Sequence, residues 1–230
     1  MKALLVDDER LARLELRRLL AAHSNIEIAG EAANAAEARA AIDSLDPDLL
    51  FLDIQMPGET GFDLLASLDR APQVIFTTAF DQYALKAFEV SALDYLVKPV
   101  VPARLAAAIA KLPAPHEKAR KALDQVFVRD GDKCWFVRLA EIALLESEGN
   151  YTRLFFGKDR PLILRSLAHL EARLDPEIFF RASRKHVLNL RWIESVDTAV
   201  NGALRAKLKG GFEVELSRRQ SQKFKETMAL

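Results

Sequence analysis

The chain has 230 residues, half of them apolar and 29% charged, and its 33 Lys and Arg residues balance its 33 Asp and Glu residues. This composition excludes an intrinsically disordered protein, which needs low hydrophobicity and high net charge. No stretch without a charged residue exceeds ten residues, whereas a membrane-spanning helix needs roughly 20 apolar ones. The single cysteine excludes an intrachain disulfide, and the start lacks the apolar core of a secretory signal. We therefore expect a cytoplasmic protein that does not associate with membranes.

The charges are distributed unevenly on the two sides of Pro113. Residues 1–112 carry 11 Lys and Arg against 17 Asp and Glu, a net charge of −6, whereas residues 113–230 carry 22 against 16, a net charge of +6. Such an asymmetry predicts two domains with different partners, of which the basic one faces nucleic acid. The alternative is an incidental difference in surface composition, because a charge of +6 is modest for 118 residues.

Short apolar runs alternate with helical patterns in the first half of the chain. The expected strands are Ala3–Val6, Ile26–Ala29, Leu49–Leu52, Val74–Phe76 and Leu93–Val97. The expected helices are Glu9–Ala22, Asn34–Leu45 (with Asn34 and Glu37 as a capping box), Gly61–Leu68, Tyr83–Phe88 and Ala103–Leu112. Five strands alternating with five helices predict an α/β fold with a doubly wound parallel sheet, in which functional residues gather at the carboxyl ends of the strands.

The pattern changes after Pro113. We expect a first domain over residues 1–112, a charged linker over residues 113–124, and a mostly-β domain with short helices over residues 125–230. The expected strands are Lys133–Leu139, Ile142–Glu146, Thr152–Phe156, Pro161–Leu164, Leu204–Leu208 and Phe212–Leu216, and the expected helices are Ser166–Leu174 and Arg218–Met228. The last two strands alternate in polarity around Gly210-Gly211, which predicts a β-hairpin.

Three carboxylates of the first domain, those of Asp7, Asp8 and Asp53, follow predicted strands and are expected to converge. Like charges this close repel one another, and a hard divalent cation with oxygen ligands neutralises them. Mg²⁺ is bound by one or two carboxylates together with water and phosphate oxygens, which suits phosphoryl chemistry. Lys98 follows the predicted strand Leu93–Val97 and offers an ammonium group to phosphoryl oxygens. Thr78, near the end of the predicted strand Val74–Phe76, offers a hydroxyl group to them. An aspartate can act as the nucleophile.

At these residues the chain resembles the receiver domain of two-component response regulators, over about residues 1–112. The matching motifs are Asp7-Asp8, Asp53-Ile54-Gln55-Met56-Pro57-Gly58 with Gly61, Thr78-Ala79, and Tyr95 with Lys98-Pro99. The resemblance implies a five-stranded flavodoxin-like fold and a sensor histidine kinase as partner. Each motif alone is also typical of an ordinary turn or strand end, so the resemblance rests on their combination.

The resemblance implies a role for each of these residues. Asp53 accepts the phosphoryl group, Thr78 and Lys98 bind its oxygens, and Mg²⁺ is held by Asp7, Asp8, Asp53 and the main chain of Gln55. Phosphorylation adds about −1.5 to −2 charge, and movement of Thr78 opens space that the switch residue Tyr95 can fill. Without the resemblance, Tyr95 would be interpreted only as a half-buried aromatic residue. Residues 81–112 correspond to the family's usual dimer face, which implies a homodimer in the phosphorylated state.

Three polar clusters in the second half lie near expected loops, at residues 148–153, 181–186 and 217–220. Arg and Lys bind phosphates, and Arg can also bind guanine edges, although each cluster alone is typical of a solvated loop. Their order resembles the LytTR DNA-binding domain over about residues 125–230. The chain departs from that family at Arg184-Lys185-His186, where many relatives carry His-Arg-Ser, and this leaves the base preference open.

This second resemblance implies that loops of a β-fold, rather than a recognition helix, contact double-stranded DNA. The residues at base-contacting positions are Asn150 or Thr152, Arg184 and Arg219. The residues expected to contact phosphates are Arg181, Lys185, Arg218 and Lys223. Asn189 is expected to be structural, and His169 and His186 lack the ligand spacing of a zinc site.

Together the two resemblances predict a phosphorylation-switched transcriptional regulator that binds promoter repeats. One alternative is a protein-interaction output in place of DNA binding, with the basic face docked on an acidic protein. The other is a phosphotransferring hydrolase, which needs a second acid two residues after its nucleophile, where this chain has Gln55. We therefore expect no enzyme activity beyond slow self-dephosphorylation.

Overall fold

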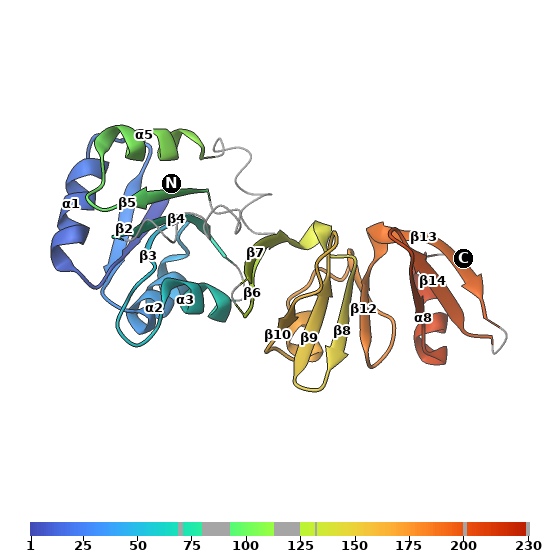
Figure 1. The fold of residues 1–230 in the computed structure, drawn as a ribbon. Helices are drawn as coiled ribbons and strands as arrows, with labels where there is room; N and C mark the ends of the chain where they lie inside the picture. Colours follow the sequence, from blue (N-terminus) through green and yellow to red (C-terminus); the bar gives the residue numbers. More distant parts are fainter. Residues whose placement is uncertain (69–70, 80–92, 113–124, 132, 200–201, 229–230) are drawn as a thin grey trace. The chain divides into compact units, whose positions relative to one another are not determined.

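The computed structural model describes residues 1–68, 71–79, 93–112, 125–131, 133–199 and 202–228 (Figure 1). The chain divides into two compact units, Met1–Val137 and Arg138–Leu230. In the part of the chain that is described, no helix is long and apolar enough to cross a membrane.

The first unit is built on a parallel five-stranded sheet in the order β2-β1-β3-β4-β5. Its strands are β1 (Lys2–Val6), β2 (Glu27–Ala32), β3 (Leu49–Asp53), β4 (Gln73–Thr78) and β5 (Asp94–Val97). The chain winds one way from β1 to β2 and the other way from β3 to β5, so the carboxyl ends of β1 and β3 flank the point where ligands bind in such sheets. The predicted doubly wound fold is confirmed.

Helices cover both faces of this sheet (Figure 1). One face carries α1 (Arg10–Leu20) and α5 (Pro102–Ala110), and the other carries α2 (Ala35–Leu45) and α3 (Gly61–Ser67). Neighbouring residues of a strand point to opposite faces, so Leu4 joins the core beneath α2 and α3 whereas Leu5 joins the core beneath α1 and α5. The helix expected over Tyr83–Phe88 lies outside the described residues.

One helix of the first unit begins at a side-chain N-cap and another at a full capping box. The Asn34 side chain accepts a hydrogen bond from the Glu37 main-chain N–H at the start of α2, as predicted, but the Glu37 carboxylate accepts from the Ala33 N–H at 2.8 Å, so the expected capping box is incomplete. At the start of α3, Thr60 accepts from the Asp63 N–H at 3.1 Å while the Asp63 carboxylate accepts from the Thr60 N–H at 3.1 Å. These bonds satisfy donors that a helix leaves unpaired at its first turn, and they fix where α3 begins after β3.

A two-stranded hairpin, β6 (Gln125–Asp130) and β7 (Lys133–Arg138), packs against α3. Phe127 of β6 is only 3% exposed, and its ring stacks on that of Phe62 with 6.3 Å between centroids. Arg129 forms an ion pair with Asp63 of α3. The sequence predicts that the second domain begins at residue 125, whereas the structure groups the hairpin up to Val137 with the first unit, because Phe127 is buried there.

The second unit consists of two antiparallel sheets with short helices, as expected. The first sheet has the order β10-β9-β8-β12-β11, with β8 (Leu144–Glu148), β9 (Tyr151–Phe155), β10 (Leu162–Ile163), β11 (Phe179–Arg181) and β12 (His186–Asn189). The second has the order β13-β14-β15, with β13 (Ile193–Thr198), β14 (Leu204–Leu208) and β15 (Phe212–Glu215). The helices are α7 (Leu167–Glu171) and α8 (Arg218–Met228), and two single 3₁₀ turns cover Leu139–Glu141 and Leu190–Trp192.

One apolar core joins the two sheets and α8. It contains Leu144 and Leu188 from the first sheet, Leu208 and Val214 from the second, and Phe224 from α8. The predicted hairpin around Gly210-Gly211 is confirmed, and both glycines have positive φ, at 91° and 85°, the conformation that this tight turn requires. Beyond the predicted elements, the structure adds β6, β11, β12 and β13.

Candidate phosphoacceptor site and nucleic-acid interface

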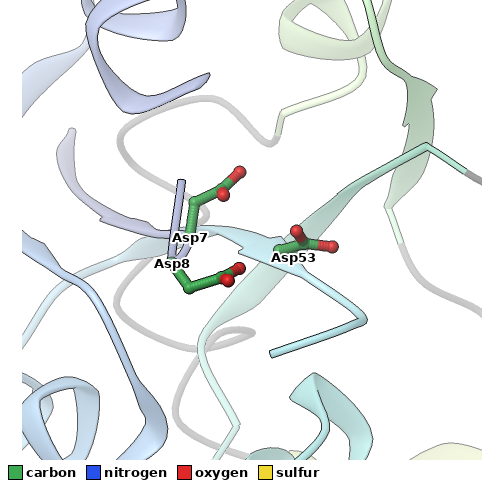
Figure 2. Close-up of side chains that lie close together, drawn as sticks. All are labelled: Asp7, Asp8 and Asp53. Atoms are coloured by element: carbon green, nitrogen blue, oxygen red, sulfur yellow. The ribbon is translucent and has the colours of Figure 1, made fainter. Parts of the chain in front are cut away.

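Three carboxylates meet at the carboxyl ends of β1 and β3 (Figure 2). Asp7, Asp8 and Asp53 each present one oxygen, and these oxygens all lie within 4.8 Å of one another. Asp7 and Asp53 are buried while Asp8 is exposed, so the cluster is open to solvent on one side. The strands bring them together as predicted, because both β1 and β3 are apolar runs that end at this edge of the sheet.

Lys98, which follows β5, lies between two of these carboxylates. Its Nζ atom is 2.7 Å from Asp7 Oδ2 and 2.8 Å from Asp53 Oδ2. Burial acts to lower the pKa of Lys98, but the hydrogen bonds to Asp53 and Asp7 outweigh it and raise the pKa, so the ammonium stays charged. Burial raises the pKa of Asp7 against the opposing effect of Lys98.

The charge of the site fits a hard divalent cation. One ammonium group offsets only part of the negative charge of three carboxylates, and all donors that remain are oxygens. The Gln55 side chain is exposed, and its main-chain N–H donates to Asp53 Oδ1 at 3.0 Å, so the backbone of residues 53–55 curls around the carboxylate.

The loop after Asp53 is held tightly against the start of α3. The Gly61 N–H donates to the Ile54 carbonyl at 2.9 Å. A Cβ atom at Gly61 would lie 2.3 Å from the main-chain oxygen of Asp53, so only glycine fits this approach. The start of α3 is therefore fixed in position relative to the Asp53 backbone.

Thr78 and Tyr95 line the neighbouring strand ends. Thr78 is fully buried at the end of β4, and its carbonyl accepts a hydrogen bond from the Lys98 N–H at 2.8 Å. Tyr95 on β5 is 6% exposed and belongs to the core beneath α2 and α3. The structure thus places the predicted switch residue inside the core rather than at the surface.

The three polar clusters of the second unit come together through backbone hydrogen bonds. The Ser147 N–H donates to the Lys185 carbonyl at 2.8 Å, which joins the end of β8 to the loop between β11 and β12. The Ser217 N–H donates to the Ala182 carbonyl at 2.9 Å, which joins the same loop to the start of α8. Segments up to 70 residues apart in the chain are therefore neighbours, and we call their exposed basic side chains the basic region.

The predicted DNA-contacting side chains differ in their exposure. Six of them are exposed, namely Asn150, Arg184, Lys185, Arg218, Arg219 and Lys223. Thr152 is fully buried and its hydroxyl donates to the Arg165 carbonyl at 2.7 Å, so Asn150 is the better placed of that pair. Arg181 is half-buried and bound to other groups of the protein.

Comparisons with known proteins agree with both halves of this geometry. Residues 3–110 match the response regulator receiver domain, and residues 132–229 match the LytTr DNA-binding domain. The transcriptional regulatory protein BtsR of Escherichia coli is 36% identical over 244 residues, which span all of both chains. The chain belongs to the LytTR family of response regulators. The sensory transduction protein LytT of Enterococcus faecalis is 34% identical over 241 residues, again spanning all of both chains.

A solved response regulatory domain, that of mrkE from Klebsiella pneumoniae, is 35% identical and covers 49% of this response regulator and 94% of its own chain, with a TM-score of 0.45. The matches place the response regulator among transcription regulators rather than enzymes. The two matched ranges leave residues 111–131 unassigned, and these include the predicted linker.

In the LytTR domain the structure shows functional neighbours that the sequence did not reveal. Glu171 of α7 forms an ion pair with Arg181, and Ser183 accepts hydrogen bonds within the loop that carries Arg184. Glu171 and Arg181 lie on different elements, α7 and β11, so no periodicity within one element pairs them. Asn189, predicted to be structural, is fully buried and donates to the Ile142 carbonyl at 2.9 Å.

Proposed function

We propose that Asp53 is the phosphoacceptor of this response regulator, with Mg²⁺ held by Asp7, Asp8, Asp53 and the main chain of Gln55. The observation that carries the proposal is the Lys98 ammonium group, which lies within 2.8 Å of both Asp7 and Asp53 inside the acidic cluster. Mg²⁺, when bound, neutralises charge on the phosphoryl oxygens. Its fit rests on the three converging oxygens.

A sensor histidine kinase is the proposed donor. An Asp53 carboxylate oxygen attacks phosphorus, the phosphorus–nitrogen bond of the phosphohistidine breaks, and its electron pair leaves with the imidazole. Lys98 then exchanges its bond to Asp53 for one to a phosphoryl oxygen, and the Thr78 hydroxyl donates to another. Since Lys98 and Thr78 are joined by a backbone hydrogen bond, β4 and β5 respond together, and Tyr95 on β5 acts as the switch.

The proposed output is binding of a homodimer to repeated sites in double-stranded promoter DNA. The support is the basic region formed by the exposed residues Asn150, Arg184, Lys185, Arg218, Arg219 and Lys223. Dimerisation after phosphorylation is assigned to the face of residues 81–112, of which residues 81–92 lie outside the described part of the chain. The response regulator must reach both the kinase and the DNA, so we propose that it acts in the cytoplasm.

The test is selection and sequencing of genomic DNA fragments bound by the purified full chain, with and without beryllofluoride as a phosphoryl mimic. Enrichment of a repeated motif that strengthens with the mimic supports both halves of the proposal. A lack of enrichment in either state contradicts DNA binding by this chain, and the basic region then has a protein as its partner.

A further inference from the structure

The loop between β11 and β12 carries Arg184 and Lys185 on a tight turn. Ser183 Oγ accepts hydrogen bonds from the N–H groups of Lys185, at 3.1 Å, and His186, at 3.2 Å. The Ala182 N–H donates to the His186 carbonyl at 2.9 Å and closes the base of the turn. These bonds form the turn, but none of them involves the carbonyl groups of Ser183 and Arg184.

Arg181 holds those carbonyl groups. Its Nε donates to the Ser183 carbonyl at 2.5 Å, and its Nη2 donates to the Arg184 carbonyl at 2.8 Å. Its Nη1 forms an ion pair with the Glu171 carboxylate of α7. The three nitrogens of the planar guanidinium group therefore bind three acceptors of the protein at once, and the side chain is only 22% exposed.

We infer that Arg181 is a positioning residue for DNA recognition, which sets the backbone under Arg184, and that Glu171 keeps its guanidinium group aimed at the loop. This inference rests on the proposed DNA-binding function, and it replaces the expected role of Arg181 as a phosphate contact. Three of the five N–H donors of this guanidinium group are already bound to the protein, and the side chain is mostly buried, so it is less available to a phosphate than the exposed arginines are. A base-reading side chain needs a fixed backbone, and Arg181 supplies it.

The two roles of Arg181 predict opposite results for conservative variants. A phosphate contact depends on charge, so Arg181→Lys should preserve it, and removal of the competing carboxylate in Glu171→Gln should strengthen binding to any DNA. A positioning residue depends on the fork geometry, which a lysine ammonium cannot reproduce. Arg181→Lys should then lose selectivity, and Glu171→Gln should weaken binding even though it removes a negative charge.

The experiment measures the dissociation constants of the full chain for the most enriched genomic fragment and for a random duplex of equal length, over a series of salt concentrations. The variants are Arg181→Lys, Arg181→Ala and Glu171→Gln. Arg184→Ala is the reference for a lost base contact, and Glu177→Gln, an exposed acid of the same unit, is the control for charge removal. Thermal unfolding of each variant checks that the fold is retained.

We expect Arg181→Lys and Arg181→Ala to weaken binding to the enriched fragment by about tenfold, as Arg184→Ala does, with unchanged affinity for random DNA and an unchanged salt slope. We expect Glu171→Gln to weaken it by a few fold, while Glu177→Gln does not. The inference is overturned if Arg181→Lys binds like the wild type, or if Glu171→Gln tightens binding to both duplexes. Equal losses on both duplexes with a lowered unfolding temperature would show a general structural role and overturn it too. A wild-type chain that enriches no fragment overturns the proposed function itself, which separates the two failures.

Discussion

Asp53 combines a reactive oxygen with a fixed position. Its side chain is 6% exposed, Lys98 holds Oδ2 at 2.8 Å, and the Gln55 N–H holds Oδ1 at 3.0 Å. Both contacts hold the carboxylate in place, and a carboxylate oxygen is the atom that attacks phosphorus. An asparagine at this position keeps the shape but has a single oxygen, which is not ionised.

We expect Asp53→Asn to abolish labelling of the full chain by a small phosphodonor such as acetyl phosphate. The wild type should be labelled with Mg²⁺ and should lose labelling when the ion is removed by a chelator, because the remaining charge of Asp7 and Asp8 then repels the donor. The measurement is the mass of the intact protein. The control is Asp43→Asn, which changes a carboxylate of α2 outside the acidic cluster. Label that persists in Asp53→Asn would place the nucleophile elsewhere.

The residues of the acidic site could be predicted from sequence because each stands at a readable strand end. Asp7 and Asp53 terminate apolar runs, and Lys98 follows another, so the topology alone brings them together. The burial of Thr152 and the engagement of Arg181 could not be predicted. They depend on a hydrogen bond from Thr152 to the Arg165 carbonyl and on bonds from Arg181 to Glu171 and two loop carbonyls, which no periodicity encodes.

At the scale of elements, α3 depends on a close approach between Gly61 and the backbone of Asp53. We expect Gly61→Ala to lower the free energy of unfolding by roughly 1–3 kcal/mol, because its Cβ would overlap a main-chain oxygen that cannot give way. It should also slow labelling of Asp53. Gly30→Ala is the matched control, because its Cβ would meet only side-chain ends, those of Leu45 at 2.8 Å and Leu4 at 3.3 Å, and no main-chain atom. Equal effects of the two substitutions in urea unfolding would contradict this account of α3.

The hairpin of β6 and β7 depends on the burial of one aromatic ring. Phe127 stacks on Phe62 and meets the ring of Phe136 at 5.0 Å, so Phe127→Ala should cost about 3–5 kcal/mol in the first unit. The chain has two tryptophans, one of them Trp135 on β7, and in a Trp192→Phe background its fluorescence reports on this hairpin. We expect an earlier urea midpoint for Phe127→Ala. The exposed Leu164 provides the control, and a Leu164→Ala effect as large as that of Phe127→Ala would argue against the packing.

The elements that the sequence predicted well are those with a strong internal pattern. The parallel strands read as apolar runs, and β14 and β15 alternate cleanly around two glycines. Strands β11 and β12 are short and surround a polar loop, so their pairing is set by the core that Phe180 and Leu188 enter rather than by local pattern. The hairpin of β6 and β7 packs with the first unit although the match to the LytTr domain begins at residue 132, since burial of Phe127 is a property of the tertiary fold.

At the scale of the whole molecule, a net charge of zero conceals local charge that should govern DNA binding. The basic region of the LytTR domain presents the exposed cations Arg184, Lys185, Arg218, Arg219 and Lys223. Each phosphate neutralised by such a group adds about −0.9 to the slope of log affinity against log salt. If three to five of them contact phosphates, we expect a slope of about −2.7 to −4.5 per chain, with Arg181 contributing nothing to it.

This slope can be measured by titrating the enriched DNA fragment at several salt concentrations with the full chain. Lys223→Ala should make the slope shallower by about 0.9 while leaving selectivity between sequences unchanged, because a phosphate contact carries no base information. Lys158→Ala, an exposed lysine on the turn after β9, removes the same charge from outside the basic region and should leave the slope as it is. Equal changes from the two lysines would mean that overall charge, rather than this surface, attracts the DNA. A slope near zero would mean that the basic region does not contact phosphates, and the output of the response regulator would then be a protein contact.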